Sequence, residues 1–180
     1  MTGEERAPQE ERGSPLGRYE PHDDATTDGA TVHVVLRGLP VQVWLASREH
    51  HDDLMREYRL LALAGDLEAH HAPARLVELV EILGQRYAAA ASRRDEELEA
   101  ALAAGLAVID QESDVTPAAV GAVRELRRLM AESDRFCEEA QLLTLPRPPV
   151  VRDFGEWFLD EFERQLEGHA PTPWDGPLTP

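Results

Sequence analysis

Two adjacent histidines followed by two aspartates are the pattern in this sequence that most resembles a chemical site. They lie in residues 45–58, LASREHHDDLMREY, where His50, His51, Asp52 and Asp53 are all residue types that bind metals or transfer protons. Adjacent side chains on a helix point about 100° apart, so the four cannot converge on one ion. We expect His50 and the acids to form a solvated face rather than a metal site.

Arg48 and His51 are predicted to lie on the other face of the same helix, on the apolar stripe between Trp44 and Tyr58. A charge on a core face needs a partner or a place at the rim. We expect either a buried polar pair, with Glu161 of the last helix as the candidate partner, or a polar anchor at a protein interface.

A second pair of histidines follows Glu68 in the run Glu68-Ala69-His70-His71. Glu68 and His71 have the Glu-x-x-His spacing of carboxylate-bridged di-iron bundles, but such bundles need the motif on two helices. The sequence contains it once, between Gly65 and Pro73, so we expect a structural turn.

Two other groups are interpreted as structural. Cys137 is expected to be a small core residue, because a lone free cysteine is usually buried. Asp110, Glu112 and Asp114 lack the glycine and bidentate glutamate of a calcium loop, and are expected in a solvated connection.

The composition excludes several classes of function. The chain has no Lys and no Asn, so it lacks a Walker-type lysine, a Schiff-base lysine and the metal-binding Asn of kinase catalytic loops. A net charge of −17 disfavours nucleic acid and anionic membranes. The chain has a single cysteine, an acidic start and no apolar run long enough to span a bilayer. These features predict a soluble, cytoplasmic protein. We predict no catalytic residue, metal or cofactor.

The apolar periodicity predicts an α+β fold, mainly α, with about five helices packed as a bundle, a small two-stranded sheet and disordered acidic termini. Residues 1–30 form the predicted disordered tail, 31–167 the single domain, and 168–180 a loose Pro-rich tail in which Trp174 can dock. The expected strands are 31–37 and 141–146; the expected helices are 41–63, 74–90, 92–105 with Ser92 as N-cap, 117–139 after Thr116 and Pro117, and 149–166.

The expected strands each precede a Leu-Pro and a helix, in LRGLP and LLTLP. Two such units could pair their strands side by side, although two amphipathic helices also resemble each other by chance. Both alternatives stay open from the sequence.

The segments LRGLPVQVWLASREHHDDLMREYRLLAL and LLTLPRPPVVRDFGEWFLDEFERQL resemble a group of uncharacterised, mostly helical actinobacterial proteins associated with anti-sigma and anti-anti-sigma regulators of the partner-switching kind. LPRPPVVRDFGEWF is also similar to the opening of the anti-sigma serine-kinase domain. The resemblance implies association with such regulators. It speaks against kinase activity, because that family binds magnesium through an Asn that this chain lacks.

We therefore expect a non-enzymatic cytoplasmic regulatory or adaptor protein that binds another protein, with an anti-sigma or anti-anti-sigma regulator as the candidate partner and a homodimer compatible with the wide apolar helix faces. The candidate interaction residues are Trp44, Arg48, His51, Tyr58, Trp157, Phe158 and Glu161. The alternative is a small-molecule or metal-binding enzyme that uses His50, His51, His70, His71 and nearby carboxylates.

Overall fold

The computed structural model describes residues 31–64, 76–78, 80–82, 85 and 88–180. The predicted tail 1–30 and the turn with His70 and His71 lie outside the described residues. Helices dominate the described part, alongside one two-stranded antiparallel sheet, which confirms the predicted class of α+β, mainly α.

The sheet pairs β1 (Val32–Pro40) with β2 (Val108–Val115) in antiparallel register, from Val32 opposite Val115 to Pro40 opposite Val108. The register shifts between Leu36 and Leu39, where Gly38 adopts a positive φ of 67°. Glycine adopts that conformation without strain, and the Gly38 N–H donates to the Asp110 carboxylate over 2.7 Å. The strand expected at 31–37 is confirmed.

The interpretation of the segment with Asp110, Glu112 and Asp114 as a connection is wrong, because these residues lie in β2, although all three are exposed to solvent as expected. Gln111, Ser113 and Val115 alternate inward along the strand and are buried. Two of these inward residues are polar, and the Gln111 amide donates to the Ser113 hydroxyl over 3.0 Å. Their polarity hides the period-2 alternation by which a half-buried strand is recognised.

Four long helices are described, and their bounds are α1 (Val41–Ala64), α3 (Ala88–Ala103), α4 (Val120–Glu138) and α5 (Pro149–Leu166). Residues 76–78, 80–82 and 85 are also helical, and Pro117–Ala119 form a 3₁₀ turn before α4. Pro117 and Pro149 each begin a helical segment as expected. Ser92 is not an N-cap, because it lies inside α3.

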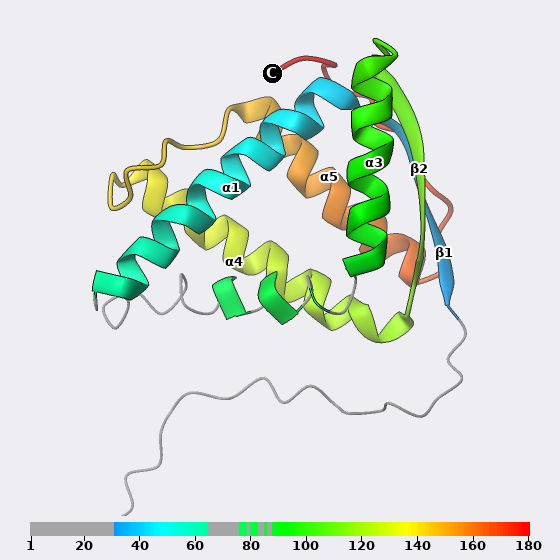
Figure 1. Ribbon diagram of the computed structural model, residues 1–180. Helices are drawn as coiled ribbons and strands as arrows, with labels where there is room; N and C mark the ends of the chain where they lie inside the picture. The colour runs from blue at the N-terminus through cyan, green and yellow to red at the C-terminus, as the bar shows by residue number, and fades with distance from the viewer. Residues whose placement is uncertain (1–30, 65–75, 79, 83–84, 86–87) are drawn as a thin grey trace, which may run out of the picture.

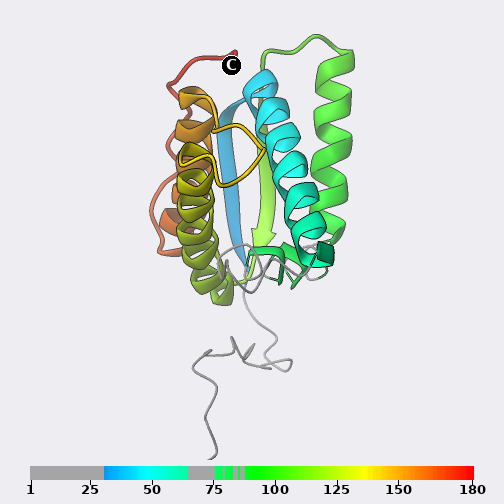
Figure 2. The ribbon, with the colours of Figure 1, turned by 90° about the vertical axis from the view of Figure 1, so that its left-hand side faces the viewer.

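The helices cover one face of the sheet, as Figures 1 and 2 show. α5 packs on β1, α3 packs on β2, and α4 packs mainly on α5. One core cluster joins the sheet to the N-terminal half of α1, to α3 and to α5. A second cluster lies between the C-terminal half of α1 and α4, and contains Leu54, Tyr58, Leu129 and the predicted core residue Cys137.

The strand expected at 141–146 is also wrong: residues 141–148, which join α4 to α5, are irregular. The free edge of β1 is already occupied. The Gln165 side chain accepts from Val35 N and donates to Val35 O, each over 2.9 Å, and Trp174 N donates to Arg37 O over 3.0 Å. This covers an edge that a second strand would otherwise pair with. The two strand-Leu-Pro-helix units therefore do not form a structural repeat.

The Pro-rich C-terminal segment is attached to the body rather than loose. Trp174 packs edge-on against Phe154 and Trp157, with ring centroids 5.8 and 5.6 Å away, which confirms that it docks. The Trp157 indole also donates to Thr172 O over 3.1 Å. Within the described residues, no helix is both long enough and apolar enough to cross a membrane.

Candidate functional site

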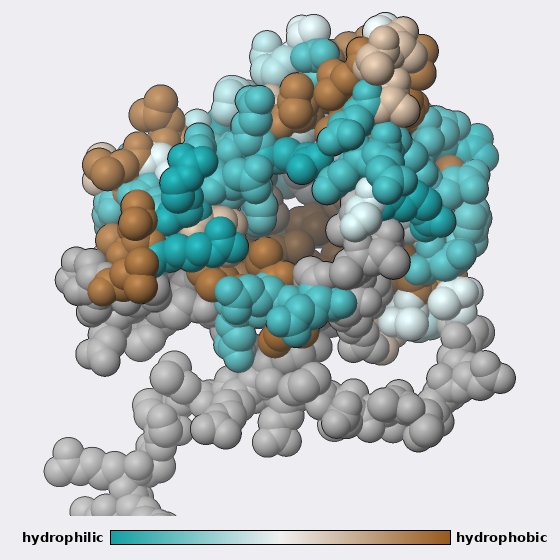
Figure 3. All heavy atoms as spheres, in the orientation of Figure 1, coloured by the Kyte–Doolittle hydropathy of each residue, from teal (hydrophilic) through white to brown (hydrophobic). Residues whose placement is uncertain are grey.

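A cavity of about 460 Å³ lies between the two core clusters and is walled by α1, α3, α4, α5 and the end of β2. Figure 3 shows this face of the molecule hollowed between α1 and α3. The volume lies within the roughly 300–1,000 Å³ of small-molecule pockets. Its walls are mostly apolar and include Val115, Val123, Leu126, Met130, Phe154, Phe158, Leu159 and Phe162.

One stripe of α1 supplies a side of the cavity. Trp44, Arg48 and His51 all line it, as expected from their spacing on one helix face. Tyr58, two turns further on, is not among the lining residues; it is fully buried in the second core cluster, where burial raises its pKa to about 12. Of the predicted residues on α5, only Phe158 reaches the cavity.

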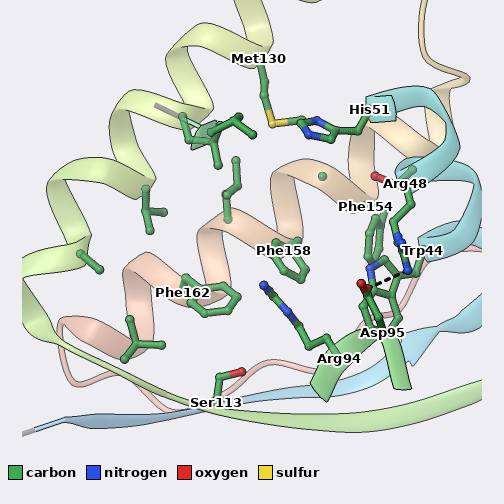
Figure 4. A pocket seen from close by; sticks show the side chains of 18 of the residues that line it. Trp44, Arg48, His51, Arg94, Asp95, Ser113, Met130, Phe154, Phe158 and Phe162 are labelled. Atoms are coloured by element: carbon green, nitrogen blue, oxygen red, sulfur yellow. Dashed lines mark ion pairs between the residues drawn. The ribbon is translucent and has the colours of Figure 1, made fainter. Parts of the chain in front are cut away.

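Arg48 does not pair with Glu161, so that part of the prediction is wrong. Its guanidinium is 2.8 Å from the Asp95 carboxylate on α3, and both side chains remain substantially exposed. Figure 4 shows this ion pair at the side of the cavity. Arg48 is therefore a charge at the rim of the cavity.

Glu161 is instead part of the attachment of the C-terminal segment. Its carboxylate, 1% exposed, accepts from Arg164 Nη1 over 2.6 Å and from Gln165 Nε2 and Thr172 N over 2.9 Å each. Together with Trp157, it holds residue 172 against α5. Glu161 and Trp157 therefore stabilise the fold at a place separate from the cavity.

His50 and His51 diverge, as the helix geometry requires. The His51 ring points into the cavity beside Met130 (Figure 4), and burial lowers its pKa. Burial also lowers the pKa of His50, which lies near the buried pair of Arg147 and Asp134 rather than fully in water as expected. Within the residues that the structure describes, no three His, Cys, Asp or Glu side chains are grouped as a metal site.

Arg94 is a cavity residue that was not predicted from the sequence. Figure 4 shows its guanidinium inside the cavity, beside Phe158 and Phe162 and above Ser113. The spacing of Arg94, Leu98 and Ala101 places the three residues on one face of α3, and Leu98 and Ala101 are buried. This spacing could have predicted that Arg94 faces the interior. It was obscured because the helix was expected to begin at Ser92, which would have placed Arg94 in the first turn.

A separate apolar surface lies at the far end of α1. It consists of Leu60 and Leu63 on α1, and Leu143 and Leu145 in the connection before α5, which are 61%, 86%, 92% and 79% exposed. We call these four residues the leucine surface; Figure 3 shows apolar side chains over this end of the molecule.

Glu57 holds the connection in place beside the leucine surface. Its carboxylate accepts from Leu143 N, Thr144 N and the Thr144 hydroxyl over 2.5, 2.7 and 2.6 Å. These hydrogen bonds lower the pKa of Glu57 in spite of partial burial. Glu57 therefore positions the backbone that carries the exposed Leu143.

Comparisons with protein-family models, with curated proteins and with solved structures found no match for this chain.

Proposed function

We propose that this protein is a non-enzymatic, cytoplasmic regulatory protein that acts by binding another protein through the leucine surface. The exposure of Leu60, Leu63, Leu143 and Leu145 at one end of the molecule carries the proposal. Single exposed leucines are common on soluble proteins, whereas a group of them marks an interaction site.

The fixed backbone around Glu57 supports this role. Three hydrogen bonds hold residues 143 and 144, so Leu143 and Leu145 are presented on an ordered connection. An ordered surface loses little conformational entropy on binding, which favours association.

The partner that fits is an apolar segment of a regulatory protein with cationic residues at its margins. Leucine side chains recognise the apolar face of a helix, and the net charge of −17 attracts a basic partner. The regulators implied by the sequence resemblance, of the anti-sigma or anti-anti-sigma kind, are the candidates to test first.

The test measures the affinity of the purified chain for these purified regulators of its host by calorimetry. We expect the double variant Leu143→Asp/Leu145→Asp to weaken binding at least about tenfold, because a charge in an apolar contact is desolvated without a partner. Leu106→Asp is the matched control, since Leu106 is 49% exposed outside the leucine surface.

Two outcomes would refute the proposal. One is unchanged affinity in the double variant. The other is a stable dimer in light scattering that the double variant dissociates, which would assign the leucine surface to a second copy of this chain.

A further inference from the structure

The cavity contains a charge in surroundings that do not suit it. Arg94 projects toward Phe158 and Phe162, in a cavity whose walls are mostly apolar. Burial lowers the pKa of Arg94, but a guanidinium group is so basic that it remains protonated at neutral pH. The cavity therefore holds a permanent positive charge.

Asp95, the acidic residue next to Arg94 along the chain, already forms an ion pair with another residue. Asp95 accepts from Arg48 over 2.8 Å at the rim. Among the described residues, Arg94 has no ion pair, although the carboxylates of Asp95 and Glu97 on the same helix act on its pKa from a distance. The Ser113 hydroxyl, which lies on the same side of the cavity, accepts a hydrogen bond from Gln111 Nε2 over 3.0 Å. Arg94 is partly buried, and a partly desolvated charge is stabilised by a partner of opposite sign, so the site as described favours an external anion.

The shape and lining of the cavity narrow the class of anion. A guanidinium forms two parallel hydrogen bonds with a carboxylate, whereas the phenyl rings of Phe154, Phe158 and Phe162 offer only apolar contacts. A highly charged ligand such as a nucleotide would meet two cations, Arg48 and Arg94, against three lining carboxylates, those of Asp52, Asp95 and Asp114. The lining thus matches one carboxylate joined to an apolar tail.

We propose that the cavity between α1, α3, α4 and α5 is a binding site for a hydrophobic monocarboxylic acid, whose carboxylate pairs with Arg94 and whose tail packs on Phe158, Phe162 and Met130. The site is distinct from the leucine surface and does not depend on the proposed protein partner.

The test uses decanoate as the probe and decanol as its neutral counterpart, with binding to the full-length chain measured by calorimetry. We expect decanoate to bind at least about tenfold more tightly than decanol, because only the carboxylate pairs with Arg94. Acetate, which carries the charge without the tail, is expected to bind at least about tenfold more weakly than decanoate, because it buries little apolar surface.

Two variants on the same helix separate the cavity from general surface charge. Arg94→Met is expected to lose the preference for decanoate while still binding decanol, which shows that the cavity is intact. Arg93→Gln is the matched control, because Arg93 is exposed one position away, and it should bind decanoate as the wild type does.

Any of three results would overturn the inference. Equal affinity for decanoate and decanol would show a cavity without anion recognition. No decanoate binding up to about 1 mM would remove the ligand class. An equal loss of decanoate binding in Arg93→Gln and Arg94→Met would assign the effect to surface charge.

Discussion

Among the described residues, the most deeply buried ion pair joins Arg147 to Asp134. Arg147 Nε donates to Asp134 Oδ1 over 2.8 Å, and the two side chains are only 5% and 12% exposed. A Cβ added at Gly155 would lie 2.6 Å from Arg147 Nη1, so the guanidinium occupies the space that a side chain on α5 would need. The pair connects the irregular 141–148 connection to α4 and α5.

Removing one partner of this pair is predicted to be costly. Asp134→Asn leaves the Arg147 charge buried without a counter-charge, and we expect a loss of about 3–5 kcal/mol in the free energy of unfolding, measured with urea. Glu138→Gln is the control, because the Glu138–Arg152 pair is much more exposed, and it should cost at most about 1 kcal/mol. Equal losses in both variants would contradict the assignment of a structural role to the buried pair.

His51 is predicted to make stability depend on pH. Burial lowers its pKa below the ordinary 6.5, against the influence of Asp52, so the unfolded chain binds the proton more tightly than the folded one. The free energy of unfolding should therefore be highest above pH 6.5 and fall as the pH drops below it. Arg94 and Asp95 of α3 and Met130 of α4 face the same cavity.

The expected result is that His51→Gln flattens the decrease in stability between about pH 7 and about pH 5, measured by urea unfolding. His33→Gln is the control of opposite sign. The hydrogen bond that His33 donates to the Asp114 carboxylate raises the pKa of His33 and favours the folded state at acid pH. A pH profile of His51→Gln identical to that of the wild type would show that other groups control acid unfolding.

At the scale of elements, the C-terminal segment completes the sheet edge and the aromatic core. Trp174 joins β1 through its backbone and α5 through its ring, so one residue links two elements that are distant in sequence. Glu161 and Trp157, both on α5, hold Thr172 of the C-terminal segment against that helix by hydrogen bonds to its backbone. This segment therefore belongs to the folded body.

We expect Trp174→Ala to lower the free energy of unfolding by about 2–3 kcal/mol, somewhat less than for a fully buried tryptophan, because Trp174 is partly exposed. The measurement is chemical denaturation followed by far-ultraviolet circular dichroism. Leu178→Ala, in the same segment at a 44% exposed position, should change stability by less than about 0.5 kcal/mol. A Trp174→Ala variant as stable as the wild type would mean that the segment is not held in solution.

Across the whole molecule, opposing electrostatic effects act on stability. α4 and α5 are joined by ion pairs of Arg124 with Glu163 and Glu167, and of Arg127 with Asp160 and Glu163. Each exposed ion pair contributes at most about 1 kcal/mol to stability. The net charge of −17 means that acidic side chains repel one another throughout the folded chain. We therefore expect the repulsion to dominate.

Raising the salt concentration from about 20 mM to about 500 mM should raise the midpoint of thermal unfolding, because the Debye length shortens and the repulsion is screened. Differential scanning calorimetry in sodium chloride and in potassium chloride should give the same increase, since screening does not distinguish the cations. A midpoint that falls with salt would show that the ion pairs between α4 and α5 outweigh the net charge.

The sequence by itself determined the elements whose periodicity is apolar and local. Spacing along a single element was enough to predict the strand 31–37 and the helices 41–63 and 149–166. It also predicted that Cys137 lies in the core and that Trp44, Arg48 and His51 share one stripe of a helix. Only the tertiary structure decided which elements pair. β2 was missed because polar Gln111 and Ser113 face inward, and the edge of β1 is covered by Gln165 and Trp174 from far along the chain.

For the cavity, too, the sequence predicted some features and the tertiary structure decided the others. Periodicity placed Arg48 and His51 on a core-facing stripe, but it carries no information on partners in other elements. Helix packing determines that Arg48 pairs with Asp95 and that Arg94 lies beside phenylalanines of α5. It also determines that Glu161 accepts a hydrogen bond from Thr172 N of the C-terminal segment. A charged side chain finds its partner in space, and contacts across the fold, rather than spacing along one helix, determine which partner it meets.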